Sequence, residues 1–348
     1  MTSQLQTRFL ITRLSAIGDC VLTMPMACAL RDAFPQAWIG WLAEAPGASL
    51  LQGHAALDEV IVAPRRVLQD PVELWKLRGK LRTYKIDITL DPQGLTKSSV
   101  LGWLTGAKQR IGFHSPVGRE ISRWFNNCKI TSRQSHVVDR YRELLSVLDI
   151  QPGKVRFDVP RQPGATQVMA QWLKEQNLTT QAFAIINAGA GWDSKVWLPE
   201  RYAAVSRHLL AKHGLPTVVV WAGDREEGWA KEVVAGSQQA ARMAPNTTLP
   251  ELAALSRHAR LFVGSDTGPL HLAAAVGVPC AGVYGPTNPA ECGPYGSVHR
   301  SVQTFLQKGS VKERRKAENV AMQAVTVEQV SAACDQVMEN SRASRAAA

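Results

Sequence analysis

The sequence lacks several features that would assign it to particular classes of protein. No apolar run in its 348 residues approaches about 18 residues, the length from which a membrane-spanning helix is inferred, so we expect no such helix. The first residues lack the charged start, apolar core and small-residue cleavage site of a secretory signal. Neither a GxxxxGK phosphate loop nor a GxGxxG dinucleotide-binding turn occurs. We therefore expect a protein that stays in the cytoplasm.

Metal-binding and disulfide-forming patterns are absent as well. The six cysteines are widely spaced, with no CxxC pair and no histidine at zinc-ligand spacing, so we interpret them as reduced and mostly buried thiols. No cluster of carboxylates has the spacing of a metal site. The residues themselves therefore require no cofactor and no metal ion, and they leave metal dependence open.

Acidic residues are scarce compared with basic ones. There are 29 Asp and Glu residues against 40 Lys and Arg residues, which gives a formal net charge of +11. This surplus indicates an acidic partner, and nucleic acid, an anionic membrane face and a phosphorylated small molecule all fit it. Hydrophobic residues make up 45%, which excludes disorder for most of the chain, and the length suggests about two domains.

Short apolar runs alternate with helical segments along the whole chain, which predicts an α/β fold with parallel sheets and crossover helices. The expected strands are 8–13, 37–42, 59–62 and 86–90 in the first half, and 182–187, 216–221, 259–264 and 280–285 in the second half. A segment rich in Pro and Gly, residues 149–167, separates the two series and is interpreted as a linker. We expect a first domain at 1–160, a second at 168–338 and a frayed tail at 339–348.

The most distinctive loop reads GSDTG over residues 264–268, and an alanine-rich helical segment containing His271 begins immediately after it. Free backbone amides at a helix start, with glycine allowing close approach, form a site suited to phosphate. The alternative is that Asp266 or Thr267 simply caps the helix. One capping residue would be sufficient for that purpose, so we favour an anion-binding loop.

A second loop, residues 187–197, reads NAGAGWDSKVW and precedes a helix start at Pro199. Its glycines, Gly189 and Gly191, would expose backbone amides to a ligand. Lys195 could offer a point charge to a phosphoryl oxygen. The alternative is that Lys195 is a solvated surface lysine, as most loop lysines are.

Two loops of the first half also follow expected strands. In residues 14–19, LSAIGD, Asp19 is interpreted either as a helix cap or as a carboxylate positioned to take a proton from a hydroxyl group. In residues 91–98, DPQGLTKS, Gln93 and Lys97 would suit a polyhydroxylated or acidic ligand. Basic residues are concentrated in this half, and most of them are expected to be solvated.

Together, these four loops resemble glycosyltransferase family 9, the ADP-heptose:lipopolysaccharide heptosyltransferases. The resemblance extends from Phe9 to about Gln303, and its most specific parts are residues 15–19, 91–98, 195–197, 264–268 with His271, and the YGPT stretch at 284–287. Residues 91–98 and 119–126 are more similar to the first heptosyltransferase, which acts on the inner-core sugar Kdo, than to the second. The GAG stretch at 189–191 departs from the pattern, because similar proteins often carry hydroxyl side chains near the phosphates.

The resemblance implies the GT-B architecture, in which two Rossmann-like doubly wound domains face each other across a cleft. It also implies an inverting transfer of heptose from ADP-heptose to the Kdo-containing inner core of lipopolysaccharide. On this hypothesis Asp19 is the general base that deprotonates the acceptor hydroxyl. Lys195 stabilises the departing diphosphate together with the amides of Thr267 and Gly268.

The resemblance also implies which residues bind each substrate. The candidate donor-binding residues are Gly189, Gly191, Asp224, Glu226, Asp266, Thr267, Gly268 and His271. Of these, Asp224 or Glu226 is expected at the adenosine ribose. The candidate acceptor-binding residues are Arg65, Arg66, Gln93, Gly94, Lys97 and Arg119. Their cations would meet the carboxylates and phosphates of an acidic acceptor.

The expected partners are a nucleotide-sugar donor, an acidic lipid-linked saccharide and the anionic inner face of the inner membrane, for a monomer that does not bind nucleic acid. Three alternatives stay open. A family member could use another nucleotide sugar or another acceptor. A nicotinamide-dependent oxidoreductase would share the Rossmann-like halves, but residues 14–19 lack its glycine pattern. A nucleic-acid-binding protein would need basic residues and stacking aromatics on one face, and the aromatics here are scattered.

Overall fold

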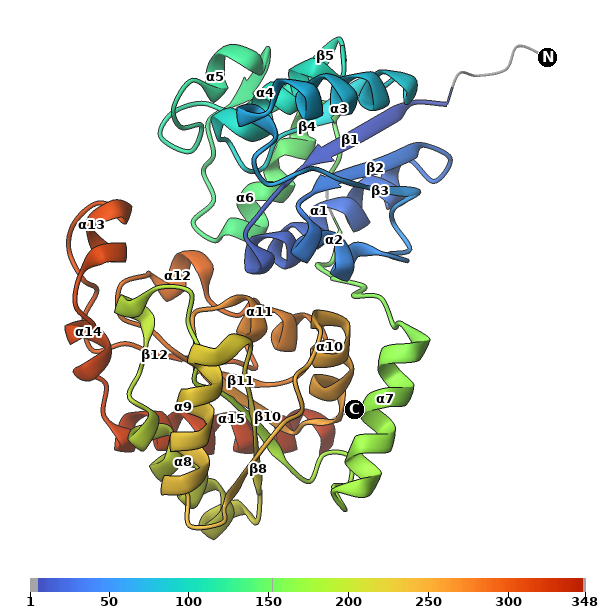
Figure 1. Cartoon of the computed structure of the whole chain (residues 1–348). Coiled ribbons are helices and arrows are strands. Elements are labelled where there is room, and N and C mark those ends of the chain that lie inside the picture. The colour runs from blue at the N-terminus through green and yellow to red at the C-terminus, as the bar shows by residue number, and fades with distance from the viewer. Residues whose placement is uncertain (1–5, 152, 347–348) are drawn as a thin grey trace. The chain divides into compact units, whose positions relative to one another are not determined.

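The structure, a computed structural model, describes residues 6–151 and 153–346, with side chains up to Ser341. The chain divides into two compact units, with the boundary between Pro160 and Arg161 (Figure 1). Each unit contains its own sheet and its own core, so the two are described in turn. Over the described ranges, no helix combines the length and the apolar character needed to cross a bilayer.

The first unit contains a six-stranded sheet in which all neighbouring strands are parallel. The strands are β1 (Arg8–Thr12), β2 (Trp38–Ala43), β3 (Glu59–Val62), β4 (Ile88–Leu90), β5 (Gln109–Phe113) and β6 (Cys128–Ile130). The helices are α1 (Ile17–Ala33), α2 (Ala45–Leu51), α3 (Pro71–Thr83), α4 (Thr96–Leu104), α5 (Ser122–Phe125) and α6 (Val137–Glu143). Two 3-10 helices, η1 (Val67–Gln69) and η2 (Leu144–Leu148), complete the unit.

The second unit also contains a six-stranded sheet of parallel strands. The strands are β7 (Ala184–Asn187), β8 (Thr217–Val220), β9 (Ala241–Met243), β10 (Leu261–Ser265), β11 (Cys280–Val283) and β12 (Arg300–Val302). The helices are α7 (Pro163–Glu175), α8 (Pro199–His213), α9 (Gly223–Gly236), α10 (Leu249–His258), α11 (Gly268–Ala275), α12 (Pro289–Cys292), α13 (Val311–Lys316), α14 (Val320–Gln323) and α15 (Val327–Ala346), with η3 at Asp193–Lys195.

Both sheets have the same topology. The spatial order is β3-β2-β1-β4-β5-β6 in the first unit and β9-β8-β7-β10-β11-β12 in the second. The winding therefore reverses between β1 and β4, and again between β7 and β10. In an open parallel sheet a ligand binds at such a reversal, beyond the carboxyl ends of the strands. The four loops singled out in the sequence are the ones that leave β1, β4, β7 and β10, so the fold places each of them at a reversal.

All the expected strands form, with ends shifted by at most two residues. Apart from the edge strand β3, where Val62 is exposed, their apolar residues are mostly buried on both faces, as helices cover both faces of a parallel sheet. Four further strands, β5, β6, β9 and β12, were not expected. The last three are edge strands of three residues each and are half-exposed, so they carry little apolar signal. The polar start of β5, Gln109-Arg110, conceals it in the same way.

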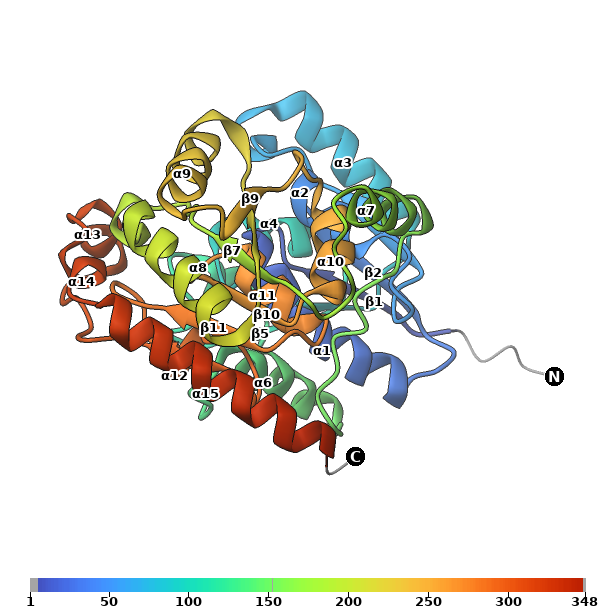
Figure 2. The same ribbon diagram turned by 90° about the horizontal axis from the view of Figure 1, so that it is seen from below.

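Two expectations about irregular segments were wrong. Helix α7 begins at Pro163, inside the expected linker, because proline is well tolerated in the first turn of a helix. Helix α15 continues to Ala346, through most of the segment expected to be a frayed tail. The reason lies in its buried stripe: Val330, Cys334 and Met338 recur every fourth residue and pack into the core of the second unit. Figure 2 shows α15 running alongside α8, which it contacts.

We predict that Met338→Ala lowers the free energy of unfolding by about 2–5 kcal/mol, because it leaves a cavity in the core of the second unit. Urea unfolding followed by circular dichroism measures the change. The exposed neighbour Glu339 provides the control, and Glu339→Ala should stay within about 0.5 kcal/mol of the wild type. Equal small effects for both variants would mean that the end of α15 is not packed.

Candidate functional site

The carboxyl ends of β7 and β10 lie side by side, because Asn187 pairs in register with Gly264. The buried side chain of Asn187 donates from Nδ2 to Thr267 Oγ1 at 3.1 Å and to the carbonyl oxygen of Gly189 at 3.3 Å. One amide thus ties the loop after β7 to the loop after β10. Sequence reasoning gave Asn187 no role, although a polar residue that ends a buried strand was a usable signal.

A buried ion-paired group joins the same two loops. Lys195 Nζ lies 2.6 Å from Asp266 Oδ2, and it also donates to the carbonyl oxygen of Asp266 at 3.1 Å. His271 Nε2 lies 2.9 Å from the other carboxylate oxygen, Oδ1. The side chains of Asp266, His271 and Lys195 are 7%, 6% and 14% exposed. Burial alone would raise the pKa of Asp266, but the hydrogen bond from His271 and the charge of Lys195 hold it well below its ordinary value.

Several donors around this group are free to meet an anion. Lys195 Nζ carries three hydrogens and uses two of them on Asp266. Helix α11 begins at Gly268, so the amides of its first turn have no acceptor within the helix. A cation and a helix start converging at one reversal point suit a phosphate group.

In the loop after β7, Gly189 packs against the carboxyl group of Glu226 from helix α9. A Cβ atom on Gly189 would overlap the carboxyl group of Glu226, so a larger residue would require the Glu226 side chain to move away from this loop. Partial burial raises the pKa of Glu226, against the opposing effect of a 3.0 Å hydrogen bond from the amide of Ala222. The structure does not bring Gly191 or Asp224 into this network. Both are exposed, and the side chain of Asp224 makes no hydrogen bond or ion pair within the described part of the chain.

In the first unit, Asp19 lies in the first turn of α1, in the loop that leaves β1. Its Oδ1 lies 2.7 Å from Arg13 Nη2, and its Oδ2 accepts a hydrogen bond from the amide of Ala16 at 3.3 Å. The Tyr141 hydroxyl lies 3.5 Å from the same Oδ1. The Arg13 side chain is 5% exposed, whereas that of Asp19 is 40% exposed. Burial would lower the pKa of Arg13, but Asp19 raises it above its ordinary value, so Arg13 stays cationic.

Gln93 and Gly94 have structural roles in the loop after β4. Gln93 is buried, and its Oε1 accepts a hydrogen bond from the amide of Leu14 at 2.7 Å, which ties the loops after β1 and β4 together. Gly94 has a φ of 62°, and a Cβ atom there would lie 2.9 Å from the carbonyl oxygen of Val117, so glycine is required. Its amide donates to the buried carboxylate of Asp91 at 3.0 Å.

Of the basic residues expected at the acceptor, Lys97 is already bonded within the fold, whereas the arginines are exposed. Lys97 Nζ lies 2.7 Å from Glu44 Oε1 and donates to the carbonyl oxygen of Arg65 at 2.6 Å, so it holds two loops together. The side chains of Arg65, Arg66 and Arg119 are exposed and make no ion pair among the residues the structure describes. Binding of an acceptor by any of these residues stays a prediction.

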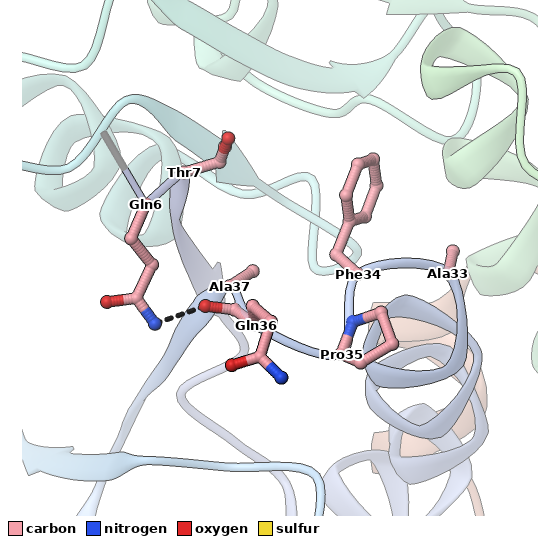
Figure 3. Close-up of a pocket in the computed structure, with 7 residues that line it drawn as sticks. All are labelled: Gln6, Thr7, Ala33, Phe34, Pro35, Gln36 and Ala37. Atoms are coloured by element: carbon pink, nitrogen blue, oxygen red, sulfur yellow. Dashed lines mark hydrogen bonds between the residues drawn. The ribbon is translucent and has the colours of Figure 1, made fainter. Parts of the chain in front are cut away.

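Two of the cavities in the described part of the chain lie outside these networks. The larger, about 520 Å³, is lined by Gln6, Thr7 and residues 33–37 at the amino ends of β1 and β2 (Figure 3). None of its described lining residues is charged, so it is not suited to an anion. The second, about 340 Å³, lies beside η3 and is lined in part by Asp193, Arg225 and Trp229. This cavity borders the loop that carries Lys195, because Asp193 and Val196 of that loop line it.

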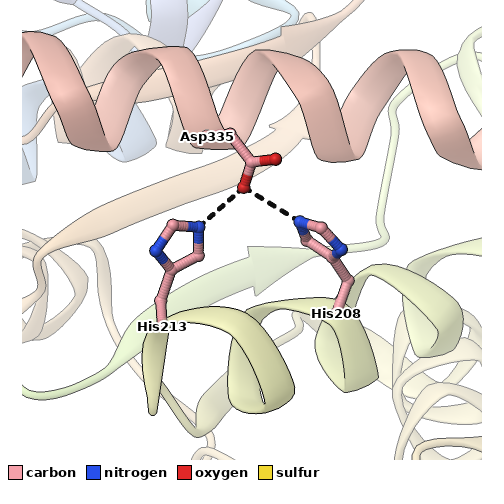
Figure 4. Close-up of side chains that lie close together, drawn as sticks. All are labelled: His208, His213 and Asp335. Atoms are coloured by element: carbon pink, nitrogen blue, oxygen red, sulfur yellow. Dashed lines mark hydrogen bonds and ion pairs between the residues drawn. The ribbon is translucent and has the colours of Figure 1, made fainter.

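A cluster of His208, His213 and Asp335 lies between α8 and α15 (Figure 4). The Nε2 atoms of His208 and His213 lie 2.9 and 2.6 Å from Asp335 Oδ1, and Lys212 Nζ lies 2.8 Å from Oδ2. These are residue types that bind metals, but the carboxylate already meets three donors and the Lys212 charge would repel a metal cation. We interpret the cluster as an ion-paired clamp that holds α15 against α8.

Comparison with known proteins identifies what these loops belong to. Residues 74–321 match the model of a family described as glycosyltransferase family 9 (heptosyltransferase). The chain belongs to glycosyltransferase family 9. The matched residues include both loops of the Lys195–Asp266–His271 group, whereas Asp19 lies before them. The expectation of a glycosyltransferase is therefore confirmed, and an oxidoreductase or a nucleic-acid-binding protein does not account for this match.

One relative and two solved structures are similar to this family 9 glycosyltransferase over most of its length. Lipopolysaccharide heptosyltransferase 1 of Escherichia coli (strain K12) is 30% identical over 300 residues, covering 83% of this chain and 91% of that protein. A family 9 glycosyl transferase from Veillonella parvula has a TM-score of 0.80 at 22% identity, covering 96% of this chain and 97% of that one. E. coli heptosyltransferase WaaC with ADP-2-deoxy-2-fluoro heptose has a TM-score of 0.72 at 25% identity, covering 96% and 100%.

These comparisons confirm two expectations about the family 9 chain. Its α/β fold is the GT-B architecture with two Rossmann-like, doubly wound domains. Among heptosyltransferases it is closest to the first, because the relatives of that name from Salmonella typhimurium, E. coli K12 and Pseudomonas aeruginosa are 28–30% identical over 83% of the chain.

Sequence reasoning missed the side chains that hold the candidate residues in place. Arg13 was a findable case, because a charged residue directly after a buried strand needs a partner. Tyr141 offered no local signal, since it lies 122 residues from Asp19 in the chain. Trp192 was part of the second loop but had no expected role, and Lys195 Nζ lies 4.5 Å from the centre of its ring.

We predict that Asp335→Asn lowers the free energy of unfolding at pH 7 by about 1–3 kcal/mol, because three donors lose a charged acceptor. Burial raises the pKa of Asp335, but Lys212, His213 and His208 lower it to about 2. A depressed pKa contributes stability above the unfolded value, about 3.9, and that contribution is lost as the pH falls through the folded value. The difference from wild type should therefore shrink between about pH 4 and about pH 2 in urea unfolding.

The exposed neighbour Gln336 supplies the control for this clamp, and Gln336→Ala should leave stability unchanged at every pH. A difference for Asp335→Asn that stays constant from pH 7 to the acid limit would contradict the ion-pair interpretation.

Proposed function

We propose that this family 9 glycosyltransferase transfers heptose from ADP-heptose to the Kdo-containing inner core of lipopolysaccharide, with inversion at the anomeric carbon. The observation that carries the proposal is the Lys195–Asp266–His271 group beside the start of α11, in a chain of this family. Support also comes from the relatives, which are named lipopolysaccharide heptosyltransferases, and from WaaC, which was solved with a fluorinated ADP-heptose.

In this proposal the second unit binds the donor. The diphosphate lies at the start of α11, where the amides of Thr267 and Gly268 and the remaining hydrogen of Lys195 Nζ meet its oxygens. Negative charge grows on the diphosphate as its bond to the anomeric carbon breaks, so donors fixed there lower the barrier. Asp266 acts through Lys195, because its ion pair holds the ammonium group in place, and His271 acts through Asp266, whose carboxylate it holds by a hydrogen bond.

The nucleoside end of the donor lies along the loop after β7. Gly189 and Gly191 let the ligand approach the backbone, and Glu226 accepts hydrogen bonds from the ribose hydroxyls. Glu226 is better placed for this than Asp224, because its carboxyl group packs against Gly189 whereas Asp224 faces solvent outside the network.

Asp19 is the general base of the proposed mechanism. It accepts the proton of the acceptor hydroxyl as that oxygen forms its bond to the anomeric carbon, and ADP leaves with the electron pair of the broken bond. Arg13 holds Asp19 Oδ1 by the 2.7 Å ion pair, and the side chain keeps enough exposure for a substrate to reach it. Tyr141 and the amide of Ala16 restrict its rotation further.

The first unit binds the acceptor. Arg65, Arg66 and Arg119 are exposed, and they meet the carboxylates and phosphates of the lipid-linked saccharide. In this proposal Gln93, Gly94 and Lys97 act indirectly, because their hydrogen bonds hold the loops that surround the acceptor. The protein is proposed to be a monomer of the cytoplasm, and the surplus of basic residues supports its attraction to the anionic inner face of the inner membrane.

One observation favours a second candidate within the same family. The GAG stretch at residues 189–191 carries no hydroxyl side chains, and Gly191 leaves open space beside the backbone. A donor other than ADP-heptose, or another acceptor, would fit a loop that recognises its ligand through backbone amides alone.

A donor screen tests the proposed function. Purified protein is incubated with several ADP- and UDP-sugars and a Kdo-lipid A acceptor, and products are detected by mass spectrometry. We expect a product only with ADP-heptose. A product from a UDP-hexose and none from ADP-heptose would leave the family and the fold standing but would reject this donor.

We predict that Asp19→Asn lowers kcat by about 10²–10⁴-fold, because the acceptor hydroxyl loses its base. Calorimetry should show that the affinity for ADP changes by no more than about two-fold. Asp32→Asn, at the exposed end of the same helix, serves as the matched control, and Tm values show whether Arg13 tolerates the loss of its partner. Turnover within a few-fold of wild type would remove Asp19 from this role.

We predict that Lys195→Met weakens ADP binding by about tenfold or more and also lowers kcat, since the cation contacts the diphosphate in both the ground state and the transition state. Lys174→Met, an exposed lysine of α7, is the control. If ADP affinity and kcat both match the control, Lys195 lies outside the donor site.

A further inference from the structure

The first unit carries large apolar side chains on its surface that none of the proposed chemistry uses. Trp75 of α3 and Trp124 of α5 are 73% and 75% exposed. Trp103 of α4 is about half exposed, and Val72 and Ile121 are exposed beside the two outer tryptophans in the sequence. Most proteins expose single apolar residues, but three exposed tryptophans on consecutive helices are unusual.

These helices form one layer on the sheet of the first unit. Helix α4 packs against both α3 and α5, and Figure 1 shows the three together on the same side of that unit. The topology requires this, because α3, α4 and α5 connect β3, β4, β5 and β6 in turn, and right-handed crossovers in one direction place their helices on one face. We call the exposed side chains Val72, Trp75, Trp103, Ile121 and Trp124 the α3–α5 face.

Helix α3 divides cleanly into an inner and an outer side. Leu77 and Leu81 are buried and pack into the core of the first unit. Val72 and Trp75 are exposed, and because they are three residues apart they lie on the same side of the helix. The exposed remainder of the helix is mostly basic, so α3 presents an apolar start and a cationic end to the solvent.

Helix α5 and its neighbours repeat this combination. The Trp103 ring meets the ring of Phe125 edge-on, at 5.8 Å between centroids, which fixes one aromatic of the face. Ile121 and Trp124 flank the exposed Arg123. The exposed basic residues of the layer are Lys76, Arg78, Lys80, Arg82, Arg119 and Arg123. Arg78, Lys80 and Arg123 make no ion pair over the described ranges, so their charges are available to a partner.

We propose that the α3–α5 face docks on an anionic lipid bilayer. Tryptophan side chains favour the interface between hydrocarbon and headgroups, and lysine and arginine nearby are attracted to anionic lipids. A second copy of the chain fits less well, because pairing through this face would bring the same unpaired cations together. The proposal rests on the proposed function, since a lipid-linked acceptor places the enzyme at a membrane surface, and it names the surface that makes the contact.

Vesicle flotation tests this surface on the full-length protein. The probes are vesicles of phosphatidylcholine alone and vesicles in which a third of the lipid is phosphatidylglycerol. We expect wild type to float with the anionic vesicles and to be released by high salt. The double variant Trp75→Ser/Trp124→Ser should lose about tenfold or more in apparent affinity, and Arg78→Glu/Lys80→Glu should lose binding to a similar degree.

The matched control is Phe305→Ser/Leu306→Ser, which removes two exposed apolar residues of the second unit. It should float like wild type, and Tm values should show that every variant is folded. The proposal is overturned if wild type ignores anionic vesicles, or if the control and the tryptophan variant lose equal affinity. A dimer, or binding of a single-stranded oligonucleotide, that depends on Trp75 and Trp124 in place of vesicle binding would also overturn it.

A soluble acceptor separates this proposal from the proposed function. Transfer to a delipidated Kdo saccharide should be the same for Trp75→Ser/Trp124→Ser and wild type within about two-fold, whereas transfer to acceptor in vesicles should fall. Vesicle binding by a wild-type protein that transfers no heptose would reject the function alone. Transfer to vesicle-borne acceptor that is unchanged in the tryptophan variant would reject the docking surface alone.

Discussion

The parallel register at the two reversal points, β1 against β4 and β7 against β10, is the constraint on which the rest of the structure depends. Parallel hydrogen bonding brings the carboxyl ends of neighbouring strands to the same edge, and the reversal sends their loops to opposite faces of the sheet. Residues about 80 positions apart, such as Leu14 and Gln93, therefore meet through direct hydrogen bonds. Every candidate catalytic or donor-binding group in the networks described above lies in or next to one of these loops.

Each unit uses a buried cation and an aspartate at its reversal point, and the two pairs are exposed to different degrees. Arg13 is buried and Asp19 is partly exposed, so the carboxylate is the member of the pair that can meet a substrate. In the second unit both Lys195 and Asp266 are largely buried. Removing a charge from water is costly unless it is paired, so each pair stabilises its loop only while both partners remain. The same contacts that make the loops stable thus orient the groups that can act.

The basic surplus of the sequence is distributed over several roles. Lys97 is used inside the first unit to hold loops together, and Lys212 belongs to the clamp on Asp335. Other cations, among them Arg65, Arg78 and Arg123, remain exposed. Net charge alone could not separate these roles, because it counts a cation paired within the fold and a cation free for a partner equally.

The sequence by itself determined the α/β class, the strands that are apolar throughout and the four loops that bear the candidate site. A buried strand that ends in GSDTG can be recognised locally, because burial and helix starts depend on neighbouring residues. Only the tertiary structure decided which of these residues meet. It joined Asp266 to both Lys195 and His271, gave Gln93 and Lys97 structural partners, left Asp224 outside, and packed α15 where a tail was expected. Such contacts join distant parts of the chain, and the pairing that creates them is set by the order of strands in the sheet, which no local pattern encodes.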